Sequence, residues 1–163
     1  MSRPALRLGV TCLVAAAVGA CAPICGIGSH FTLSSARVDS TYTCPKQVTN
    51  HPYDVNATID ADNFTNNTVT IRSIAETDTA VAIHGDWNGE LGAKGGGSVA
   101  DYSPRSIGAG SKATIRFRIP FQCTDQGTIT SSTYGDFKFA FTVTTSAGTF
   151  KLDSANKHRL ITP

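Results

Sequence analysis

The sequence predicts an all-β fold in which antiparallel sheets pack face to face. Two stretches, 111–123 and 134–145, alternate apolar and polar residues along their length. Because successive side chains of a strand point to opposite faces, each stretch has one apolar face and one solvent face. The chain also contains 15 glycines and many serines and threonines, which suit turns and strands. Strands with one apolar face need a second sheet to cover it, so we expect a β-sandwich.

Length and charge narrow the functional classes. A chain of 163 residues accommodates one domain. Arg3 and Arg7 precede every acidic residue, and subtracting them from the 14 basic residues leaves 12, which equals the number of acidic residues. The part of the chain that follows them therefore has a formal charge of zero and no general attraction for nucleic acid or anionic lipid. We expect no nucleic-acid partner.

The N-terminal residues have the layout of a secretory signal. Arg3 and Arg7 precede an uncharged run, 8–19, which ends in small residues. The run is shorter than the roughly 20 apolar residues that a membrane-spanning helix needs. We therefore expect residues 1–22 to be a signal peptide and the protein to be extracellular or part of the cell envelope.

Two ways of processing this signal are compatible with the residues. The tetrapeptide Val18-Gly19-Ala20-Cys21 resembles the lipobox of bacterial lipoproteins, although Gly19 is an unusual residue at its position. The resemblance implies lipidation of Cys21 and a membrane contact through that anchor only. Alternatively, an ordinary signal peptidase would cut after Ala20 or after Ala22.

The cysteines predict one disulfide in the folded domain. Five cysteines are present, of which Cys12 lies inside the signal peptide. Cys44 and Cys123 each fall where an expected strand meets a loop, and export favours disulfide formation. We therefore expect Cys44 and Cys123 to be bridged. The alternative is two buried, unbridged thiols, and Cys25 is left without an assigned partner.

The domain is expected to begin soon after the signal peptide. Residues 23–37 are small and polar and are expected to form a linker or an edge strand near 31–38. A short strand is expected to carry Tyr42 towards Cys44. The β-sandwich domain is assigned to 38–163.

A hairpin is expected in the first half of the domain. Residues 53–61 alternate between apolar and polar side chains, and 62–67 is rich in turn-forming residues. The returning strand, 67–74, has a break in its alternation, which a bulge near Ser73 would restore.

The second half is expected to hold further strands separated by turns. Residues 85–98 are too rich in glycine to form a regular element. In the strand before them, Val81 and Ile83 are expected to point inwards, and in the last strand Phe150 and Leu152 are. The expected strands are 79–84, 98–102, 111–123, 134–145 and 149–153.

One segment resembles a known family. Residues 104–115, Pro-Arg-Ser-Ile-Gly-Ala-Gly-Ser-Lys-Ala-Thr-Ile, look like the turn-and-strand signature of immunoglobulin-like and fibronectin-type domains in bacterial surface proteins. The resemblance covers the C-terminal two-thirds of the chain. It implies an antiparallel immunoglobulin-like β-sandwich and a role in adhesion or as a spacer. The spacing of Cys44 and Cys123 is not that of the antibody intersheet bridge.

No motif in the sequence indicates catalysis. A serine nucleophile elbow, a phosphate-binding loop and a zinc-protease motif are all missing. We therefore expect no enzyme activity, no cofactor and no metal. A metal-binding redox protein on a sandwich scaffold is the enzyme-class alternative, but the histidines are far apart in the sequence and form no paired motif: His30, His51, His84 and His158.

The only tryptophan marks a candidate ligand site. Trp87 lies beside Asp86 and Asn88 at the start of the glycine-rich segment, and with Tyr102 it would offer a stacking platform for a sugar ring. The alternative is that Trp87 folds back over the end of the sandwich as a lid. Three Asn-X-Ser/Thr sequons are also present, at Asn56, Asn63 and Asn66.

These observations favour a non-catalytic, exported or lipid-anchored β-sandwich module for interaction or structure at the cell surface. Its partner would be a protein or a glycan. A carbohydrate-binding module that uses Trp87 and Tyr102 is the second hypothesis, and the redox protein is the third.

Overall fold

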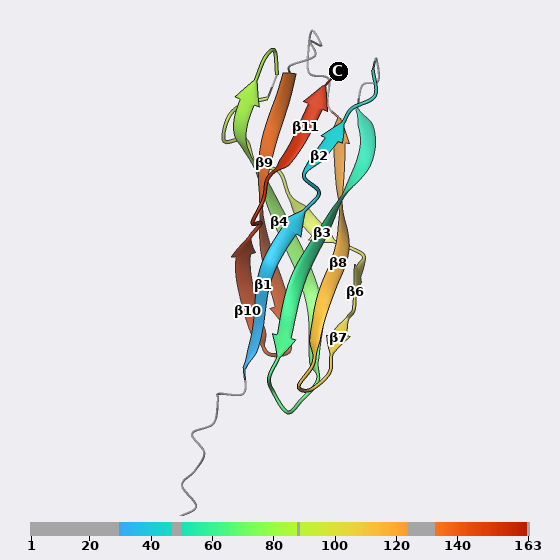
Figure 1. The fold of residues 1–163 in the computed structure, drawn as a ribbon, viewed down its shortest axis with the longest axis vertical. Helices are drawn as coiled ribbons and strands as arrows, with labels where there is room; N and C mark the ends of the chain where they lie inside the picture. Colours follow the sequence, from blue (N-terminus) through green and yellow to red (C-terminus); the bar gives the residue numbers. More distant parts are fainter. Residues whose placement is uncertain (1–29, 47–49, 88, 124–132, 163) are drawn as a thin grey trace, which may run out of the picture.

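The computed structural model describes residues 30–46, 50–87, 89–123 and 133–162. The expected signal peptide, Cys21 and Cys25 lie outside the described residues. The described part of the chain forms an elongated two-layer β structure (Figure 1). No described segment forms a helix that is long and apolar enough to span a membrane.

The first sheet contains the longest expected strand. Its order is β1 (Phe31–Val38), β3 (His51–Asn63), β8 (Lys112–Cys123) and β6 (Tyr102–Ser103), and all neighbours are antiparallel. The alternation in β8 behaves as predicted, because Ile115, Phe117 and Ile119 are buried while Arg116 and Arg118 are exposed. This sheet therefore has an apolar inner face and a charged outer face.

The second sheet is built around two long strands. Its order is β2 (Thr41–Thr43), β11 (His158–Thr162), β9 (Thr133–Thr145), β4 (Val69–His84) and β5 (Gly97–Val99). In addition, β10 (Gly148–Asp153) pairs with β9, and β7 (Ser106–Ile107) pairs with β4. In β9, Phe139, Phe141 and Val143 are buried as the alternation predicts.

The strand order identifies the fold as an immunoglobulin-like sandwich. The order β1-β3-β8-β6 follows the A-B-E-D sheet of that fold, and β10-β9-β4 follows its G-F-C sheet. The predicted fold class is thus confirmed. One pair of neighbouring strands is parallel, because β2 runs in the same direction as β11.

The first strand changes sheets between β1 and β2. At this crossing, the Asn156 amide nitrogen donates to the Val38 carbonyl at 2.7 Å, and its amide oxygen accepts from the Val38 N–H at 3.1 Å. The side chain thus takes the place of a strand partner at the break between β10 and β11. His158 Nδ1 bonds the next carbonyl along the chain, that of Asp39, at 2.7 Å.

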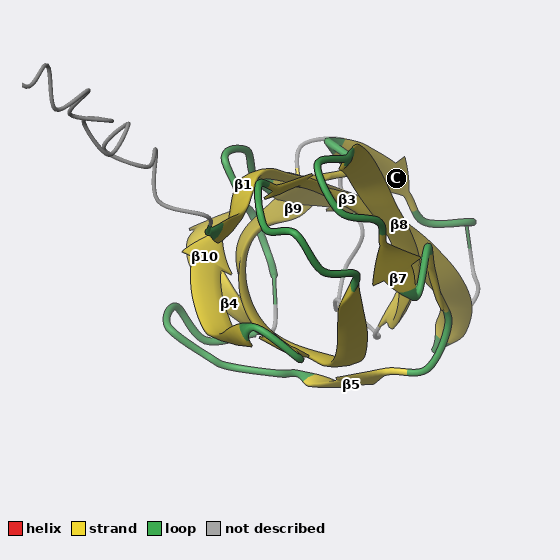
Figure 2. Ribbon diagram, turned by 90° about the horizontal axis from the view of Figure 1, so that it is seen from below, coloured by secondary structure: helices red, strands yellow, loops and turns green. Residues whose placement is uncertain are grey.

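The two sheets enclose one main core and a smaller cluster at one end. Figure 2, a view along the long axis, shows the strands curving around the interior, with the segment that carries β5 running along one side. Phe31 and Ala36 of β1 lie in the main core, so this strand belongs to the sandwich. The smaller cluster contains Cys44, Cys123 and Leu160.

The expected hairpin of 53–61 and 67–74 is wrong. β3 pairs with β1 and β8, whereas β4 pairs with β9, so the turn between them carries the chain from one sheet to the other. The buried amide of Asn63 holds this turn, since its nitrogen donates to the carbonyls of Asn67, Ile107 and Gly108. The alternation of apolar and polar residues shows which face of a strand is buried, but it does not show which strand lies next to it in the sheet.

The region expected to hold a separate strand at 79–84 is part of β4. The predicted bulge near Ser73 is confirmed, because the register with β9 shifts between Ile71 and Ser73. This first shift moves the inward side chains from odd to even positions, so Asp78 and Ala80 are buried. A second shift follows between Ala80 and Ala82, and the expected inward residues Val81 and Ile83 are only half-buried.

Candidate binding groove

The structure does not bring the expected stacking residues together. Trp87 is half-buried, lies 6.0 Å from Phe137 between ring centroids, and packs in the small cluster at the disulfide end. Tyr102 is 8% exposed and lies in the main core, with its hydroxyl 3.4 Å from the Ile71 carbonyl. Asp86 is exposed, and Asn88 lies outside the described residues. The position of Trp87 matches the lid interpretation.

The disulfide forms between the expected cysteines. Cys44 follows β2 of the second sheet and Cys123 ends β8 of the first, with 5.9 Å between their Cα atoms. The bridge therefore joins the two sheets at one end of the sandwich. This arrangement could be anticipated only in part, because the sequence does not show which sheet each cysteine belongs to.

The histidines do not gather into a metal site in the described part of the chain. No group of three or more His, Cys, Asp or Glu residues is arranged there to hold an ion. His84 stacks on Tyr134 at 5.0 Å between centroids, while His158 is buried. Burial lowers the pKa of His158 and keeps its ring neutral.

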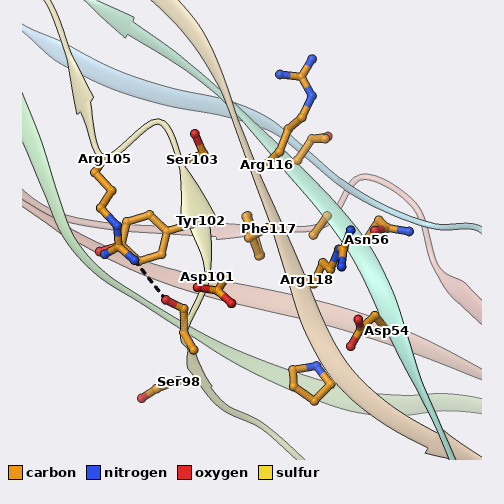
Figure 3. Close-up of a pocket in the computed structure, with 14 residues that line it drawn as sticks. Asp54, Asn56, Ser98, Asp101, Tyr102, Ser103, Arg105, Arg116, Phe117 and Arg118 are labelled. Carbon is orange, nitrogen blue, oxygen red and sulfur yellow. Dashed lines mark hydrogen bonds between the residues drawn. The ribbon is translucent and has the colours of Figure 1, made fainter.

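A large hollow lies on the outer face of the first sheet. It is an open groove of about 880 Å³ between the outer face of β3 and β8 and a rim formed by residues 98–105 (Figure 3). β3 contributes Asp54, Asn56 and Thr58, β8 contributes Arg116, Arg118 and Pro120, and the rim contributes Ser98, Asp101, Tyr102 and Arg105.

Strand register places the groove residues on one face. Asn56 pairs with Arg118, and Thr58 pairs with Arg116. These are the polar positions of two alternating strands, so the same period that buries Phe117 exposes both arginines. The sequence pattern predicts this basic face directly.

The rim is a segment in which the chain crosses from the second sheet to the first. β5 pairs with β4 in the second sheet, and only a few residues later β6 pairs with β8 in the first. The single strand expected at 98–102 is thus divided between two sheets. Arg105 lies over the Tyr102 ring at 4.3 Å and donates to the Ala100 carbonyl at 3.3 Å, which stiffens the rim.

The two groove arginines are not neutralised by nearby carboxylates. Arg116 donates to the Thr114 carbonyl at 3.4 Å, and neither Arg116 nor Arg118 forms an ion pair with a described residue. By contrast, Arg159 on the second sheet makes a two-point bond to Asp136 at 2.7 and 3.0 Å. The groove therefore holds guanidinium groups that are available to a ligand.

A smaller acidic cavity of about 230 Å³ lies behind the rim. Glu76 and Asp78 of β4 line it together with Gly97 and Ile119, and one carboxyl oxygen of Glu76, Oε2, is buried without a hydrogen-bond partner in the described structure. Burial and then the neighbouring charge of Asp78 raise the pKa of Glu76 to about 7, against a smaller lowering by the Gly97 N–H. Burial also raises the pKa of Asp78.

The sequence patterns predict neither the rim nor the acidic cavity. The glycine-rich segment was expected to be irregular, which gives no information about where it lies. A usable signal was present in β4, where Ile74, Glu76, Asp78 and Ala80 share one parity and therefore one face. Acidic side chains such as Glu76 and Asp78, on the same strand face as buried apolar residues, indicate a polar pocket in the interior.

Comparisons with known proteins show distant likeness in structure only. No protein-family model matches the chain, and a search of curated proteins gives no match. A structural genomics target, SoR45, is 13% identical with a TM-score of 0.37, covering 82% of this chain and 86% of its own. A protein described as ApaA from Bordetella pertussis is 15% identical with a TM-score of 0.35, covering 82% of this chain and 94% of its own. The ASH/PapD-like domain 7 of human CEP192 is 14% identical with a TM-score of 0.35, covering 97% of this chain and 98% of its own. With TM-scores this low, the fold assignment rests on the strand order and not on these likenesses.

Proposed function

We propose that this protein is an exported, non-catalytic immunoglobulin-like module that binds a partner at the cell surface through the groove on its first sheet. The observation that carries the proposal is the pair Arg116 and Arg118. These two guanidinium groups line an open groove and form no ion pair with the described residues. Arginine is enriched among the residues that contribute most of the binding energy at protein interfaces.

The leader and the disulfide support export. Arg3 and Arg7 followed by the uncharged run 8–19 have the layout of a secretory signal. The bridge between Cys44 and Cys123 is of the kind that persists in an oxidising compartment. Lipidation of Cys21 would hold the module at a membrane face, whereas cleavage after Ala20 or Ala22 without lipidation would release it.

Export is tested by cell fractionation combined with mass spectrometry of the mature N-terminus. The expected result is a chain that lacks the first residues and is found outside the cytoplasm. A mature chain that begins at an acylated Cys21 identifies the anchored form. Full-length protein in the cytoplasm, with Met1 or Ser2 as its first residue, contradicts the proposal.

The binding face is tested by photo-cross-linking in cells. A photoreactive phenylalanine analogue replaces Thr58, which lies in the groove, and in a matched chain it replaces Thr142, which lies on the middle strand of the second sheet. The expected result is a covalent adduct from position 58 that position 142 does not give. Adducts from both positions, or from neither, contradict the assignment of the groove as the binding face.

A further inference from the structure

We propose that the ligand of the groove is an extended peptide segment that carries acidic side chains on alternate residues. This inference rests on the proposed function and names the chemistry of its partner. It follows from the spacing of the two arginines, the geometry of their guanidinium groups and the residues around them.

The spacing of the arginines matches the repeat of an extended chain. Arg116 and Arg118 are two residues apart on one strand, so their Cα atoms are separated by about 6.8 Å, twice the rise per residue. Side chains on alternate residues of a bound extended peptide have the same separation. A peptide lying along β8 therefore places one acidic side chain opposite each guanidinium group.

The chemistry of the arginine side chain favours a carboxylate. A guanidinium presents parallel N–H donors that fit the two oxygens of one carboxyl group. Arg37 adds to the field, because it is exposed and pairs with Thr58, which in turn pairs with Arg116 across the sheet. This row of paired residues thus places positive side chains on β1 and β8, on either side of the neutral Thr58 of β3.

The acidic residues of the groove restrict the negative charge of the ligand. Asp54 and Asp101 also line the groove, and Asp54 pairs with Pro120 beyond the arginine rows. A uniformly charged polymer such as a sulfated polysaccharide would bring anionic groups against these carboxylates. A peptide with two acidic residues in register avoids that repulsion, since its other side chains are free to be neutral.

The groove also has surfaces for the uncharged parts of a peptide. Pro120 is exposed and lines the groove beside the arginines, and at the rim the Arg105 side chain lies over the largely buried Tyr102 ring. Proline has no backbone N–H, so Pro120 offers an apolar surface and no strand-pairing donor. The ligand is therefore expected to lie on the face of β8 rather than to extend the sheet at its edge.

The test is fluorescence anisotropy on the full mature chain with labelled synthetic peptides. One peptide alternates Glu and Thr, a second has the same composition with its glutamates in a block, and a third has Gln in place of Glu. The expected order is strongest binding by the alternating peptide, binding weaker by about fivefold or more for the block, and none for the Gln peptide. Equal affinity for the alternating and block peptides would overturn the proposal, because it would show attraction by charge without register.

Variants assign the effect to the two arginines. Arg116→Ala and Arg118→Ala are each expected to weaken binding of the alternating peptide by about tenfold. Arg116→Lys is expected to fall between the wild type and the alanine variant, because it keeps the charge but loses the two-point bond. Arg72→Ala, which removes an exposed arginine from the second sheet, is the matched control and is expected to leave affinity unchanged. Unchanged affinity in both groove variants, with circular dichroism showing intact folding, would overturn the proposal.

A competition experiment with heparin tests whether the groove prefers an acidic peptide to another anionic polymer. Heparin that displaces the alternating peptide and binds more tightly than it does would overturn the peptide assignment in favour of an anionic glycan. Failure of the peptide proposal can also be distinguished from failure of the proposed function. A cross-link from position 58 without any preference for alternating acids rejects the ligand class and keeps the binding face, whereas peptide binding without a cross-link in cells rejects the cellular role.

Discussion

The Tyr53 hydroxyl and His158 Nε2 lie 2.9 Å apart inside the disulfide end of the sandwich. The other ring nitrogen of His158 bonds the Asp39 carbonyl, which can only accept, so Nδ1 carries the proton. Nε2 must then accept from the tyrosine. A second proton on His158 would reverse the direction of this hydrogen bond, because the phenol oxygen can also accept.

The burial of His158 predicts a loss of stability in acid. Burial lowers the pKa of His158 below its ordinary value of 6.5, so the unfolded chain binds a proton that the folded chain resists. Stability is therefore expected to fall as the pH drops below 6.5. Urea unfolding at a series of pH values should show this fall in the wild type and a smaller one in His158→Gln. His84→Gln changes an exposed histidine and should leave the profile unaltered.

Removing the tyrosine hydroxyl is expected to weaken the fold at neutral pH. Tyr53→Phe leaves the buried Nε2 of His158 without a donor, at a cost of about 1 to 2 kcal/mol in the free energy of unfolding. A Tyr53→Phe protein as stable as the wild type in urea would argue against the bond.

Glu76 predicts a pH effect of the opposite sign. Its pKa is raised from 4.5 to about 7 in the folded state, so its contribution to stability is complete below pH 4.5 and is lost as the pH rises through about 7. After allowance for solvent screening, Glu76→Gln should be more stable than the wild type at pH 8 by on the order of 1 to 2 kcal/mol, and equal to it at about pH 4. Glu90→Gln, at an exposed glutamate, is the control. Thermal unfolding that shows no gain for Glu76→Gln at high pH contradicts the prediction.

Asn63 predicts a large effect for a small polar side chain. Its amide is buried and bonds three carbonyls, and its oxygen accepts from Thr65. Asn63→Ala should therefore lower the free energy of unfolding by about 2 to 3 kcal/mol, because it leaves buried groups without partners. Asn66→Ala, three residues along the same turn and exposed, should change it by less than about 0.5 kcal/mol. Similar urea midpoints for the two variants would refute this role of Asn63.

The disulfide is expected to contribute strongly to stability. It joins residues 79 apart in sequence, and replacing Cys44 and Cys123 by alanine should cost about 2 to 4 kcal/mol. Addition of a reductant should lower the melting temperature of the wild type and leave the double variant unchanged. A wild type that is insensitive to reductant under unfolding conditions would indicate free thiols.

Side-chain alternation made the strands predictable but not their partners. β8 and β9 could be placed because every second residue is apolar, and their burial follows that period. The partner of β3 could not be read in the same way, since any strand with an apolar face satisfies its pattern. β11 was not expected, because its pairing with β9 depends on the break at residues 154–157 and on bonds from Asn156 and His158.

For a similar reason, the arginine face of the candidate groove could be predicted from the sequence and its rim could not. The exposure of Arg116 and Arg118 follows from the alternation of a single strand. The rim depends on where residues 97–103 cross from one sheet to the other, and that crossing is set by pairs far apart in sequence, such as Ile74 with Val99 and Tyr102 with Phe117. Trp87 attracted attention as an aromatic residue in a glycine-rich segment, but its position over Gly135 is a packing relationship that no local pattern records.

The bridge between the sheets also determines which residues bear tension when the chain is pulled. β1 starts at one end of the long axis and the C-terminal strand finishes at the other (Figure 1). When a force between the two ends separates β1 from β3, the covalent path runs along the backbone to Cys44, across the sulfur bridge, and onwards from Cys123. Residues 45–122, which include β3, β4 and both groove arginines, form a closed covalent loop outside that path. Pulling on the ends therefore cannot extend the backbone of this loop while the bridge is intact.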